Sequence, residues 1–384
     1  MALKNEDLKV AVIGGGMIAN AAHIPAWQDQ PGVRVVGVAD RVLDTARATA
    51  QRHCIPSAYD DARRMLEELR PDAVSVCTPT CYHREHVTAA LRAGAHVLCE
   101  KPVAAGSGDA EEMFQAAEAA QRTLLVGQSM RFFNQVTAAR QFAAAGELGE
   151  IYYADASRLR RRGMPMWGNF HMKLHSGGGP LLDLGVHILD CLLWIMGNPK
   201  VVTASSVTFR KLACRKDGLL TSLAESGAPV GVFDSPAPDY RDLDVEDTGV
   251  VLLRLENGAA ISLRVSWAAN VPDSVGGLIC VMGTEGGLSF DTRVPELKLV
   301  KSIQQHQTDI SPKLPAPHPN HPFYAHWKEV AHFVRVIRGE EEPVIKREEV
   351  LNVIRALEAA YRSAALGSEV RLDGQERRAQ GAAL

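Results

Sequence analysis

Cysteine pairs, long apolar runs and a leader-like N-terminus are all lacking from this 384-residue sequence. The seven cysteines are an odd number without a Cys-x-x-Cys pair, which argues against a disulfide framework and against a metal-thiolate cluster. No stretch approaches the roughly 18 uninterrupted apolar residues that a membrane span needs. The first seven residues carry two acids and no apolar core, unlike a signal peptide. We therefore expect a reduced, cytoplasmic protein with no membrane partner and no bound metal.

An excess of charge of either sign is also lacking. The 42 Lys and Arg residues nearly balance the 45 Asp and Glu residues, for a formal net charge of −3. The one basic cluster, at residues 158–162, is short. Nucleic-acid binders depend on more extensive clusters of Lys and Arg, so we expect no nucleic-acid partner.

The composition is that of a globular protein, with 46% hydrophobic and 23% charged residues. The length predicts two domains. Up to residue 128, short apolar segments alternate with amphipathic ones. The strands predicted there are residues 9–13, 33–39, 73–77, 95–99 and 123–126, and the helices between them include 17–30 and 43–53. This alternation predicts right-handed βαβ units and a parallel sheet in an α/β domain over residues 1–128.

From residue 129 onward the pattern changes. The expected elements are a helix at 134–145, a strand at 151–159, an apolar helix at 181–196, strands at 250–255 and 259–265, and closing helices at 323–338 and 347–366. The Asn257-Gly258 pair is a strong hairpin signal between the last two strands. Residues 211–246 look like a long surface excursion. Residues 129–384 therefore predict an α+β domain with an antiparallel or mixed sheet.

A glycine-rich turn follows the first predicted strand. Residues 14–19 (GGGMIA) fit Gly-x-Gly-x-x-Ala, in which Gly14 permits a tight turn and Gly16 lets the backbone approach a pyrophosphate. A simple structural turn also matches this pattern. Asp40 ends the second strand, where an acid binds the adenosine ribose of NAD and repels the 2′-phosphate of NADP. Arg41 could pair with that phosphate, so NADP stays open. A P-loop is excluded because no Gly-Lys-Ser/Thr follows.

Two further groups of residues carry reactive side chains. Strand carboxyl ends face the ligand crevice of an open α/β sheet, so Lys101 in Glu100-Lys101-Pro102 should lie there. Asp183 and His187 are four residues apart on the apolar helix, which places them on one face, about 6 Å apart. Asp183 and His187 could be a hydrogen-bonded pair in the core, or His187 could be a general base with the Asp183 carboxylate beside it. Glycines 177–179 give this helix a flexible entry.

With these motifs the sequence resembles the glucose–fructose oxidoreductase / inositol dehydrogenase (Gfo/Idh/MocA) family. The matching stretches are residues 12–19 (VIGGGMIA), Thr78-Pro79-Thr80 with His83, 93–102 (AGAHVLCEKP), the Asp183/His187 helix and 363–367 (SAALG). The resemblance implies a Rossmann domain followed by a substrate-binding and oligomerisation domain with a large, mostly antiparallel open sheet. It also implies pairing of sheet faces in a homodimer or homotetramer, and a Lys101–Pro102 peptide that is often cis.

The resemblance further implies a catalytic set of Lys101, Asp183 and His187 acting on a sugar, sugar derivative or inositol. The predicted cofactor-binding residues are Gly14, Gly16, Met17, Ile18, Asp40, Arg41, Thr78, Pro79, Thr80, His83, Glu100, Lys101 and Gln128. The predicted substrate-binding residues are Lys101, Arg160, Trp167, His171, Lys173, Asp183 and His187.

Three hypotheses about function follow. The first is an NAD(P)-dependent dehydrogenase in which His187 takes a hydroxyl proton while hydride passes to nicotinamide, and Lys101 stabilises the developing alkoxide. The second is redox-assisted glycoside cleavage with a tightly bound, recycled NAD. The third is a non-enzymatic NAD-binding sensor, which the intact set of Lys101, Asp183 and His187 disfavours.

Overall fold

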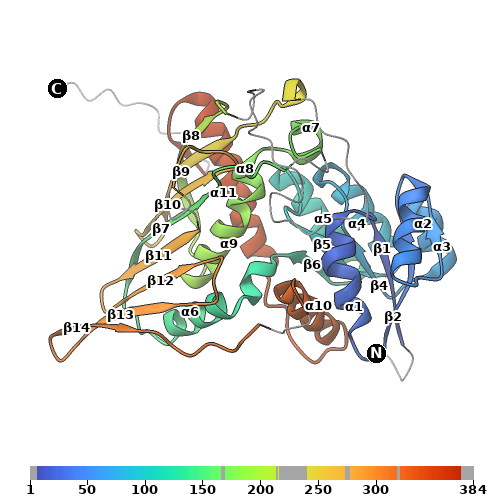
Figure 1. The fold of residues 1–384 in the computed structure, drawn as a ribbon, viewed down its shortest axis with the longest axis horizontal. Coiled ribbons are helices and arrows are strands. Elements are labelled where there is room, and N and C mark those ends of the chain that lie inside the picture. The colour runs from blue at the N-terminus through green and yellow to red at the C-terminus, as the bar shows by residue number, and fades with distance from the viewer. Residues whose placement is uncertain are drawn as a thin grey trace.

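The computed structural model describes residues 7–165, 169–212, 215, 240–272, 277–317 and 321–372. They form two sheets with helices between and around them (Figure 1). The first sheet contains the parallel strands β1 Leu8–Ile13, β2 Val33–Ala39, β3 Ala58–Tyr59, β4 Ala73–Val76, β5 His96–Glu100 and β6 Leu124–Gly127. Their spatial order is β3-β2-β1-β4-β5-β6, the doubly wound order of a dinucleotide-binding domain.

Helices cover both faces of this sheet, as a parallel sheet requires. They are η1 Ala19–His23, α1 Ile24–Gln28, α2 Leu43–Arg52, α3 Ala62–Leu69, η2 Thr80–Tyr82, α4 His83–Arg92 and α5 Ser107–Ala120. The expected parallel α/β architecture is confirmed, with strand ends within one residue of those predicted. The helix expected at 17–30 contains a π-helical turn, η1, before α1.

The second sheet has nine strands in the order β14-β13-β12-β11-β7-β10-β9-β8-β15. The strands are β7 Ile151–Leu159, β8 Val201–Phe209, β9 Thr248–Leu255, β10 Ala260–Ser266, β11 Leu278–Gly283, β12 Gly287–Asp291, β13 Lys298–Ile303, β14 His306–Ile310 and β15 Val370–Arg371. Only β7 and β10 pair in parallel among these strands. The predicted mixed sheet and the hairpin at Asn257-Gly258, which joins β9 to β10, are confirmed.

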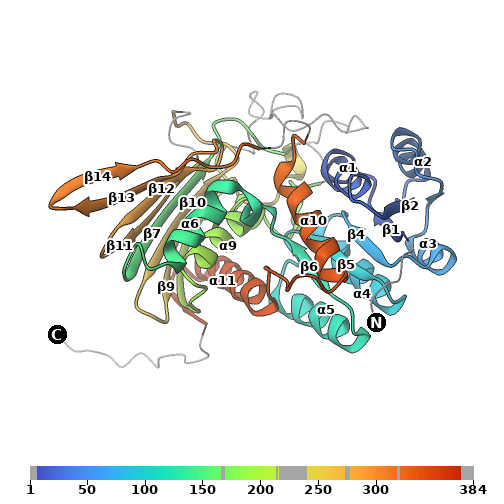
Figure 2. The ribbon, with the colours of Figure 1, turned by 90° about the horizontal axis from the view of Figure 1, so that it is seen from below.

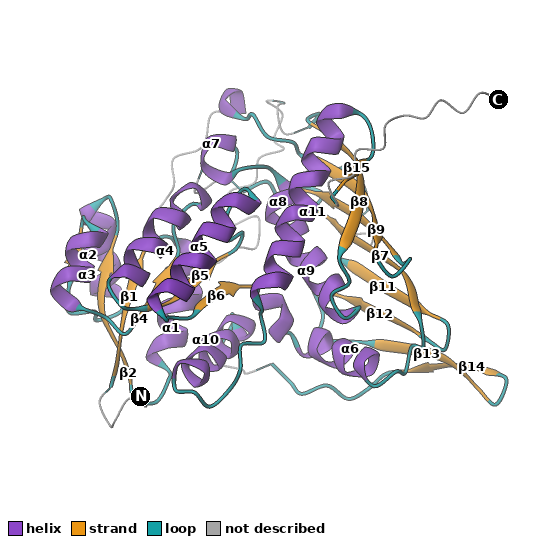
Figure 3. Cartoon of the chain, turned by 180° about the vertical axis from the view of Figure 1, so that it is seen from behind, coloured by secondary structure: helices purple, strands orange, loops and turns teal. Residues whose placement is uncertain are grey.

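One face of the second sheet is covered by helices, and these lie between the two sheets (Figures 2 and 3). The remaining helices are η3 Ser129–Phe132, α6 Asn134–Ala144, α7 Lys173–Ser176, α8 Pro180–Asp183, α9 Gly185–Ile195, η4 Tyr240–Asp242, α10 Tyr324–Ile337 and α11 Arg347–Leu366. The other face carries exposed apolar side chains, among them Val207, Phe209, Leu252 and Leu278.

The single helix expected at 181–196 is wrong in one respect, because the structure divides it at Leu184. The segments 173–183 and 185–195 are bent by 45° relative to each other. Because of this division Asp183 is the last residue of α8, and its carbonyl oxygen accepts a hydrogen bond from the Lys101 ammonium. The bend therefore gives Asp183 two acceptors for one cation, its side chain and its backbone.

The domain boundary expected between residues 128 and 129 falls at the end of β6, just before η3. The chain later returns across it, because α10 packs against α1 and α11 packs against α5. The boundary remains a prediction. Most of the excursion expected at 211–246, namely residues 213–214 and 216–239, lies outside the described residues.

Among the described helices, none alone is long and apolar enough to cross a membrane. The bent pair at 173–183 and 185–195 meets the requirement by length and composition only.

Candidate active site

The glycine-rich turn after β1 is built by close backbone contacts. Gly14 has φ +98°, and a Cβ there would lie 2.7 Å from the carbonyl oxygen of Cys77 at the end of β4. The Gly15 amide donates to Asp40 Oδ2 at 2.9 Å. A Cβ on Gly16, by contrast, would meet no atom within 4 Å. Gly14 thus serves the fold, whereas Gly16 leaves free space where the backbone faces outward.

Asn20 holds this turn from behind, and sequence reasoning did not identify it. Its side-chain amide donates to the carbonyl oxygens of Gly15 at 2.7 Å and Gly16 at 2.9 Å. Met17 and Ile18 continue the turn and are half-buried. The Asn20 contacts keep both carbonyl oxygens on the protein side of the turn, away from the position of an anionic phosphate.

Two buried polar atoms at the carboxyl ends of β4 and β6, which flank β5, make no hydrogen bond within the described residues. They are Thr78 Oγ1, just after β4, and Gln128 Oε1, just after β6. Buried polar groups are normally paired, so such atoms indicate a missing partner. Both were predicted to contact the cofactor, and with the free space at Gly16 they fit a dinucleotide in this cleft.

Most of the other predicted cofactor residues lie at two places, beside the glycine turn and at η2. Asp40 lies beside the glycine turn and also accepts from the Val42 amide at 3.0 Å, while Arg41 next to it is exposed. Pro79 and Thr80 begin η2 and are half-buried. His83 is buried, with Nε2 2.8 Å from the carbonyl oxygen of Thr78.

The second ring nitrogen of His83, Nδ1, lies 2.9 Å from the carbonyl oxygen of Pro102. His83 therefore joins the turn after β4 to the turn after β5. Burial lowers the pKa of His83, partly offset by these backbone contacts. The contacts favour a positioning role, in which His83 acts on the cofactor cleft through the backbone.

The turn after β5 contains a cis peptide bond between Lys101 and Pro102. Glu100 is buried and accepts from His23 Nε2 at 2.9 Å, and its other oxygen accepts from the Lys101 amide at 3.1 Å. Burial alone would raise the pKa of Glu100. The hydrogen bond and charge of His23, with the charges of His326 and Lys101, lower it to about 2. Glu100 is thus an ionised anchor of the turn that presents Lys101.

Lys101 reaches across to the second sheet's helices. Its ammonium donates to Asp183 Oδ1 at 2.9 Å and to the Asp183 carbonyl oxygen at 3.3 Å. The other carboxylate oxygen accepts from Trp267 Nε1 at 2.9 Å. Burial alone would raise the pKa of Asp183, but the charges of Lys101 and Arg160 and the two hydrogen bonds hold it well below its usual range. Sequence reasoning named Lys101 and Asp183 but missed Trp267 as the second donor.

His187 lies one turn further along, at the start of α9. It is half-buried, and its Nδ1 makes no hydrogen bond within the described residues. Burial first, and then the charge of Lys101, lower the pKa of His187 well below its usual range. The imidazole is therefore neutral near pH 7 and able to accept a proton.

The glycines before α8 are required by packing, a reason that the sequence did not predict. A Cβ on Gly178 would lie 2.2 Å from Tyr361 Oη, and one on Gly179 would lie 2.1 Å from the Glu246 carbonyl oxygen. Glu246 also accepts from the amides of Gly179 at 3.0 Å and Leu181 at 3.1 Å. This carboxylate caps the helix that carries Asp183, and Tyr361 donates to it at 2.8 Å.

The remaining predicted substrate residues are dispersed. Arg160 lies close enough to Asp183 for its charge to lower that carboxyl's pKa. His171 is buried, and its carbonyl oxygen accepts from the Asp244 amide. Lys173 is exposed, with its amide bonded to Asp244. No described contact brings His171 or Lys173 to Asp183, and Trp167 lies outside the described residues.

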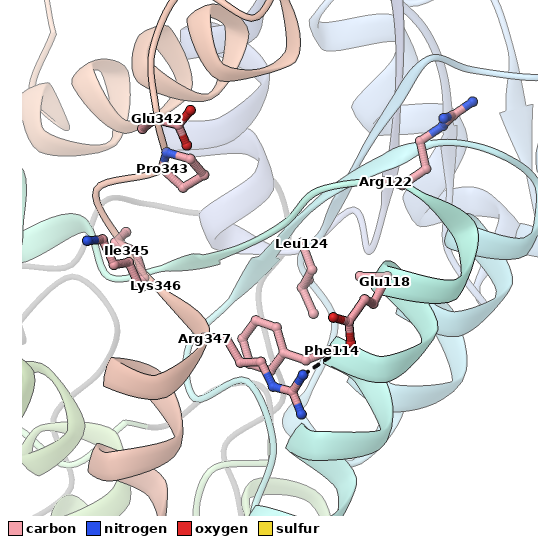
Figure 4. A pocket seen from close by; sticks show the side chains of 10 residues that line it. Phe114, Glu118, Arg122, Leu124, Glu342, Pro343, Ile345, Lys346 and Arg347 are labelled. Atoms are coloured by element: carbon pink, nitrogen blue, oxygen red, sulfur yellow. Dashed lines mark hydrogen bonds and ion pairs between the residues drawn. The ribbon is translucent and has the colours of Figure 1, made fainter. Parts of the chain in front are cut away.

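A separate hollow of about 450 Å³ lies between α5 and the segment leading into α11 (Figure 4). Leu124, the first residue of β6, lines it, so it opens at the amino ends of the parallel strands. Arg347 and Glu118 pair across it at 3.3 Å. It is therefore on the opposite edge of the sheet from Lys101. The described residues contain no group of three or more His, Cys, Asp or Glu side chains arranged to hold a metal ion.

Comparison with protein families gives two matches. Residues 8–128 match the model described as an oxidoreductase family with an NAD-binding Rossmann fold. Residues 136–289 match the model of the GFO/IDH/MocA C-terminal domain.

Individual relatives match over nearly their whole lengths. D-glucoside 3-dehydrogenase of Escherichia coli (strain K12) is 30% identical over 375 residues, covering 97% of this chain and 99% of the relative. The scyllo-inositol 2-dehydrogenase (NADP(+)) of Bacillus subtilis (strain 168) is 26% identical over 383 residues, covering 94% of each chain. The crystal structure of GenD2 from gentamicin A biosynthesis in complex with NAD superposes with a TM-score of 0.75 at 26% identity, covering 97% of this chain and 98% of that one.

Proposed function

The chain belongs to the Gfo/Idh/MocA family of oxidoreductases, and from this premise we propose that it transfers hydride between NAD(P) and a secondary hydroxyl of a sugar, sugar derivative or inositol. The relatives are named as dehydrogenases of glucosides, inositols and xylose. These names favour net hydride transfer over redox-assisted glycoside cleavage. The single observation that carries the proposal is the contact of Lys101 with Asp183, beside His187 and next to the cleft of the first sheet.

In this reaction His187 takes the proton of the substrate hydroxyl. Its neutral imidazole is the form that accepts a proton, and general-base catalysis contributes about 10²–10⁴-fold in rate. Lys101 donates a hydrogen bond to the same oxygen and stabilises the alkoxide charge that develops there. When bound, NAD(P) supplies the hydride acceptor.

Asp183 acts on the position of the other two groups. Its contacts with Lys101 and Trp267 fix both carboxylate oxygens, so the ammonium is held at one point of the cleft. One contact comes from the first sheet and the other from the second, so Asp183 joins the cofactor side to the substrate side. Such a preorganised donor needs no rearrangement during the reaction.

We favour NAD over NADP. The Asp40 carboxylate lies at the glycine turn, where it accepts the Gly15 amide at 2.9 Å, and would repel a 2′-phosphate. Arg41 is exposed beside it and keeps NADP possible. Replacing Asp40 by Ser should lower the ratio of NAD to NADP affinity, as measured by fluorescence titration with the reduced cofactors.

We also propose a homo-oligomer, a homodimer or homotetramer, formed through the uncovered face of the second sheet. Exposed apolar side chains on β8, β9 and β11 support this, because apolar patches of this kind mark protein interfaces. Sedimentation equilibrium measures the mass directly.

The decisive experiment compares His187→Ala with wild type. A panel of inositols, aldoses and glycosides is incubated with NAD or NADP, and NADH or NADPH formation is followed by nicotinamide absorbance. We expect His187→Ala to lose 10²–10⁴-fold in kcat/KM while NADH affinity is retained. His306→Ala, at an exposed position on β14, is the matched control and should keep full activity. Equal turnover of wild type and His187→Ala would end the assignment of His187.

A further inference from the structure

Two arginines lie at the end of β7 nearest the candidate active site. Arg158 and Arg160 alternate with Ala154 and Ala156, which are fully buried, so all four residues lie on the sheet face that the helices cover. The strand pattern extends to Arg160, whose amide donates to the Ser266 carbonyl oxygen. Both side chains are therefore directed to the side of the sheet on which α8 and α9 carry Asp183 and His187.

Their charges reach the catalytic candidates. The charge of Arg160 contributes to the low pKa of Asp183, and the charge of Arg158 contributes to the low pKa of His187. Trp267, which donates to Asp183, follows β10, and β10 pairs with β7 so that Ser266 lies opposite Leu159. Arg158 and Arg160 are thus neighbours of the Lys101–Asp183 contact.

Neither arginine has a carboxylate partner within the described residues. Arg158 donates to the hydroxyl of Thr292, and Arg160 donates to the Gly163 carbonyl oxygen at 2.9 Å. Asp291 is near Arg158, but Arg293 holds it with contacts of 2.9 and 3.1 Å from Nε. A guanidinium has five donors, and within the described residues Arg158 and Arg160 each use only one nitrogen, which leaves the others to bind a ligand.

Among the described residues, the charges around this end of the cleft do not cancel. Lys101 is paired with Asp183 and Arg293 with Asp291, whereas no described acid is paired with Arg158 or Arg160. Burial first, and then the charge of Arg160, lower the pKa of Arg158 to about 10. Placing two cations side by side without an anion costs free energy unless a ligand supplies the opposite charge.

Resting on the function proposed above, we propose that the substrate is an anionic sugar whose carboxylate or phosphate group binds Arg158 and Arg160. The planar guanidinium matches both groups by paired hydrogen bonds. The hydroxyl to be oxidised would then face Lys101 and His187, with the anionic group held on the β7 side of the cleft. This accounts for the two arginines on the inner face of a strand whose other inner-face residues, Ala154 and Ala156, are apolar.

Calorimetric titration of the NADH-loaded full chain tests this without requiring turnover. Methyl hexosides of gluco, galacto and manno configuration are compared with the corresponding methyl hexuronosides and hexoside 6-phosphates. We expect one anionic series to bind about 10- to 100-fold more tightly than its neutral counterpart, the range for hydrogen bonds to charged groups. The two anionic series distinguish a sugar acid from a sugar phosphate. Equal affinity of neutral and anionic members throughout would overturn the proposal.

Variants of the arginines test which side chains cause the preference for anionic sugars. Arg158→Met and Arg160→Met should each abolish most of the preference, while Arg161→Met, which alters an exposed neighbour on the same segment, should keep it. Arg158→Lys retains the charge but loses the paired geometry, so it should retain an intermediate preference and also guards against misfolding of the Met variant. A preference that survives both Met variants assigns the anion to another site and contradicts the proposal.

The same panel separates this inference from the proposed function. Wild type that oxidises neutral and anionic sugars equally well keeps the dehydrogenase assignment but overturns the anionic substrate. Wild type that binds an anionic sugar through Arg158 but forms no NADH or NADPH with any sugar supports the ligand chemistry and overturns the dehydrogenase assignment.

Discussion

Asp183 and Asp190 lie seven residues apart on the same bent helical segment, and each binds a cation from an earlier part of the chain. Arg131 in η3 donates to both oxygens of Asp190, at 2.6 and 2.7 Å, and its remaining nitrogen contacts the Val344 carbonyl oxygen and Glu349. The side chains of Arg131 and Asp190 are each 1% exposed. Lys101 and Asp183 retain 15% and 12% side-chain exposure.

The difference teaches how to tell a structural ion pair from a functional one. All three nitrogens of Arg131 donate to acceptors of the protein, so this guanidinium is held by the fold. Beside Asp183, by contrast, His187 has an unpaired buried nitrogen, and Arg158 and Arg160 lack carboxylate partners within the described residues. Saturated contacts hold α9 in place, whereas the incompletely satisfied groups mark the site of chemistry.

The largest effect that sharpens this comparison is expected for Lys101→Met. The variant keeps most of the side-chain volume but removes the donor to the substrate oxygen, so kcat/KM should fall by about 10²–10⁴-fold. The loss of unfolding free energy should be smaller than for Arg131→Met, because both side chains keep some exposure and Asp183 keeps its hydrogen bond from Trp267. Steady-state kinetics and urea unfolding of the same preparation measure both. Retention of full activity would contradict the catalytic role of Lys101.

Arg131→Met should give the opposite result. It leaves Asp190 and Glu349 without their cation, and breaking a buried pair from one side costs about 3–5 kcal/mol. Urea unfolding followed by circular dichroism measures the loss. Where folded protein remains, its kcat/KM should be close to that of wild type, because Arg131 does not contact the candidate active site.

A double variant serves as the control for that prediction. Adding Asp190→Leu to Arg131→Met removes one of the stranded carboxylates and should recover part of the lost stability. A stability loss for Arg131→Met smaller than that for Lys101→Met would reverse the comparison.

A smaller effect is expected from two matched glycine substitutions. Gly179→Ala places a methyl group against the Glu246 backbone and displaces the start of α8, with a cost of about 1–3 kcal/mol. Gly16→Ala meets no protein atom, so stability should be unchanged while NADH affinity falls by about tenfold, or 1.4 kcal/mol. Thermal melts and NADH titration distinguish the two. Unchanged NADH affinity in Gly16→Ala would argue against cofactor contact at that turn.

Features that depend on residues close together in the sequence could be predicted, whereas those that depend on distant contacts could not. The parallel sheet and the glycine turn follow from local patterns, and β2, β7 and α11 begin and end where expected. Lys101 and Asp183 were named, through motif and resemblance, 82 residues apart. The stretches around Glu246 and Trp267 resemble those of a subgroup that acts on sugars or inositols, but the contacts of these residues and of Asn20 were not predicted. Each acts through a contact distant in the sequence or through backbone atoms.

The bend at Leu184 is another feature that local sequence patterns do not predict. An apolar run from 181 to 196 predicts one helix, but the contact of Lys101 with the Asp183 carbonyl oxygen is a tertiary interaction. Arg158 is instructive as well, because the sequence predicted Arg160 as a substrate contact but did not name Arg158 beside it. Alternation along β7 turns Arg158 and Arg160 to the covered face while Arg161 stays exposed.

The smallest effect concerns the pKa of His187. Burial and the charge of Lys101 both lower it, so the neutral imidazole should persist below pH 6.5. The unfolded state binds this proton more readily, and the contribution of His187 to stability is therefore lost as the pH falls below about 6.5. Removing the charge of Lys101, in Lys101→Met, should shift the pKa of His187 upward. Titration of histidine-labelled protein by NMR measures this without requiring activity.

Two controls test whether a shift in the pKa of His187 is specific to the loss of the Lys101 charge. The pKa of His53, lowered by burial and by Arg52, should not change in Lys101→Met, because Lys101 is not among its causes. Arg131→Met should leave the pKa of His187 unchanged, because the charges that lower it are those of Lys101 and Arg158. An upward shift of His187 in Arg131→Met comparable to that in Lys101→Met would mean that the two ion pairs act on the site alike, and the division into a structural and a functional pair would fail.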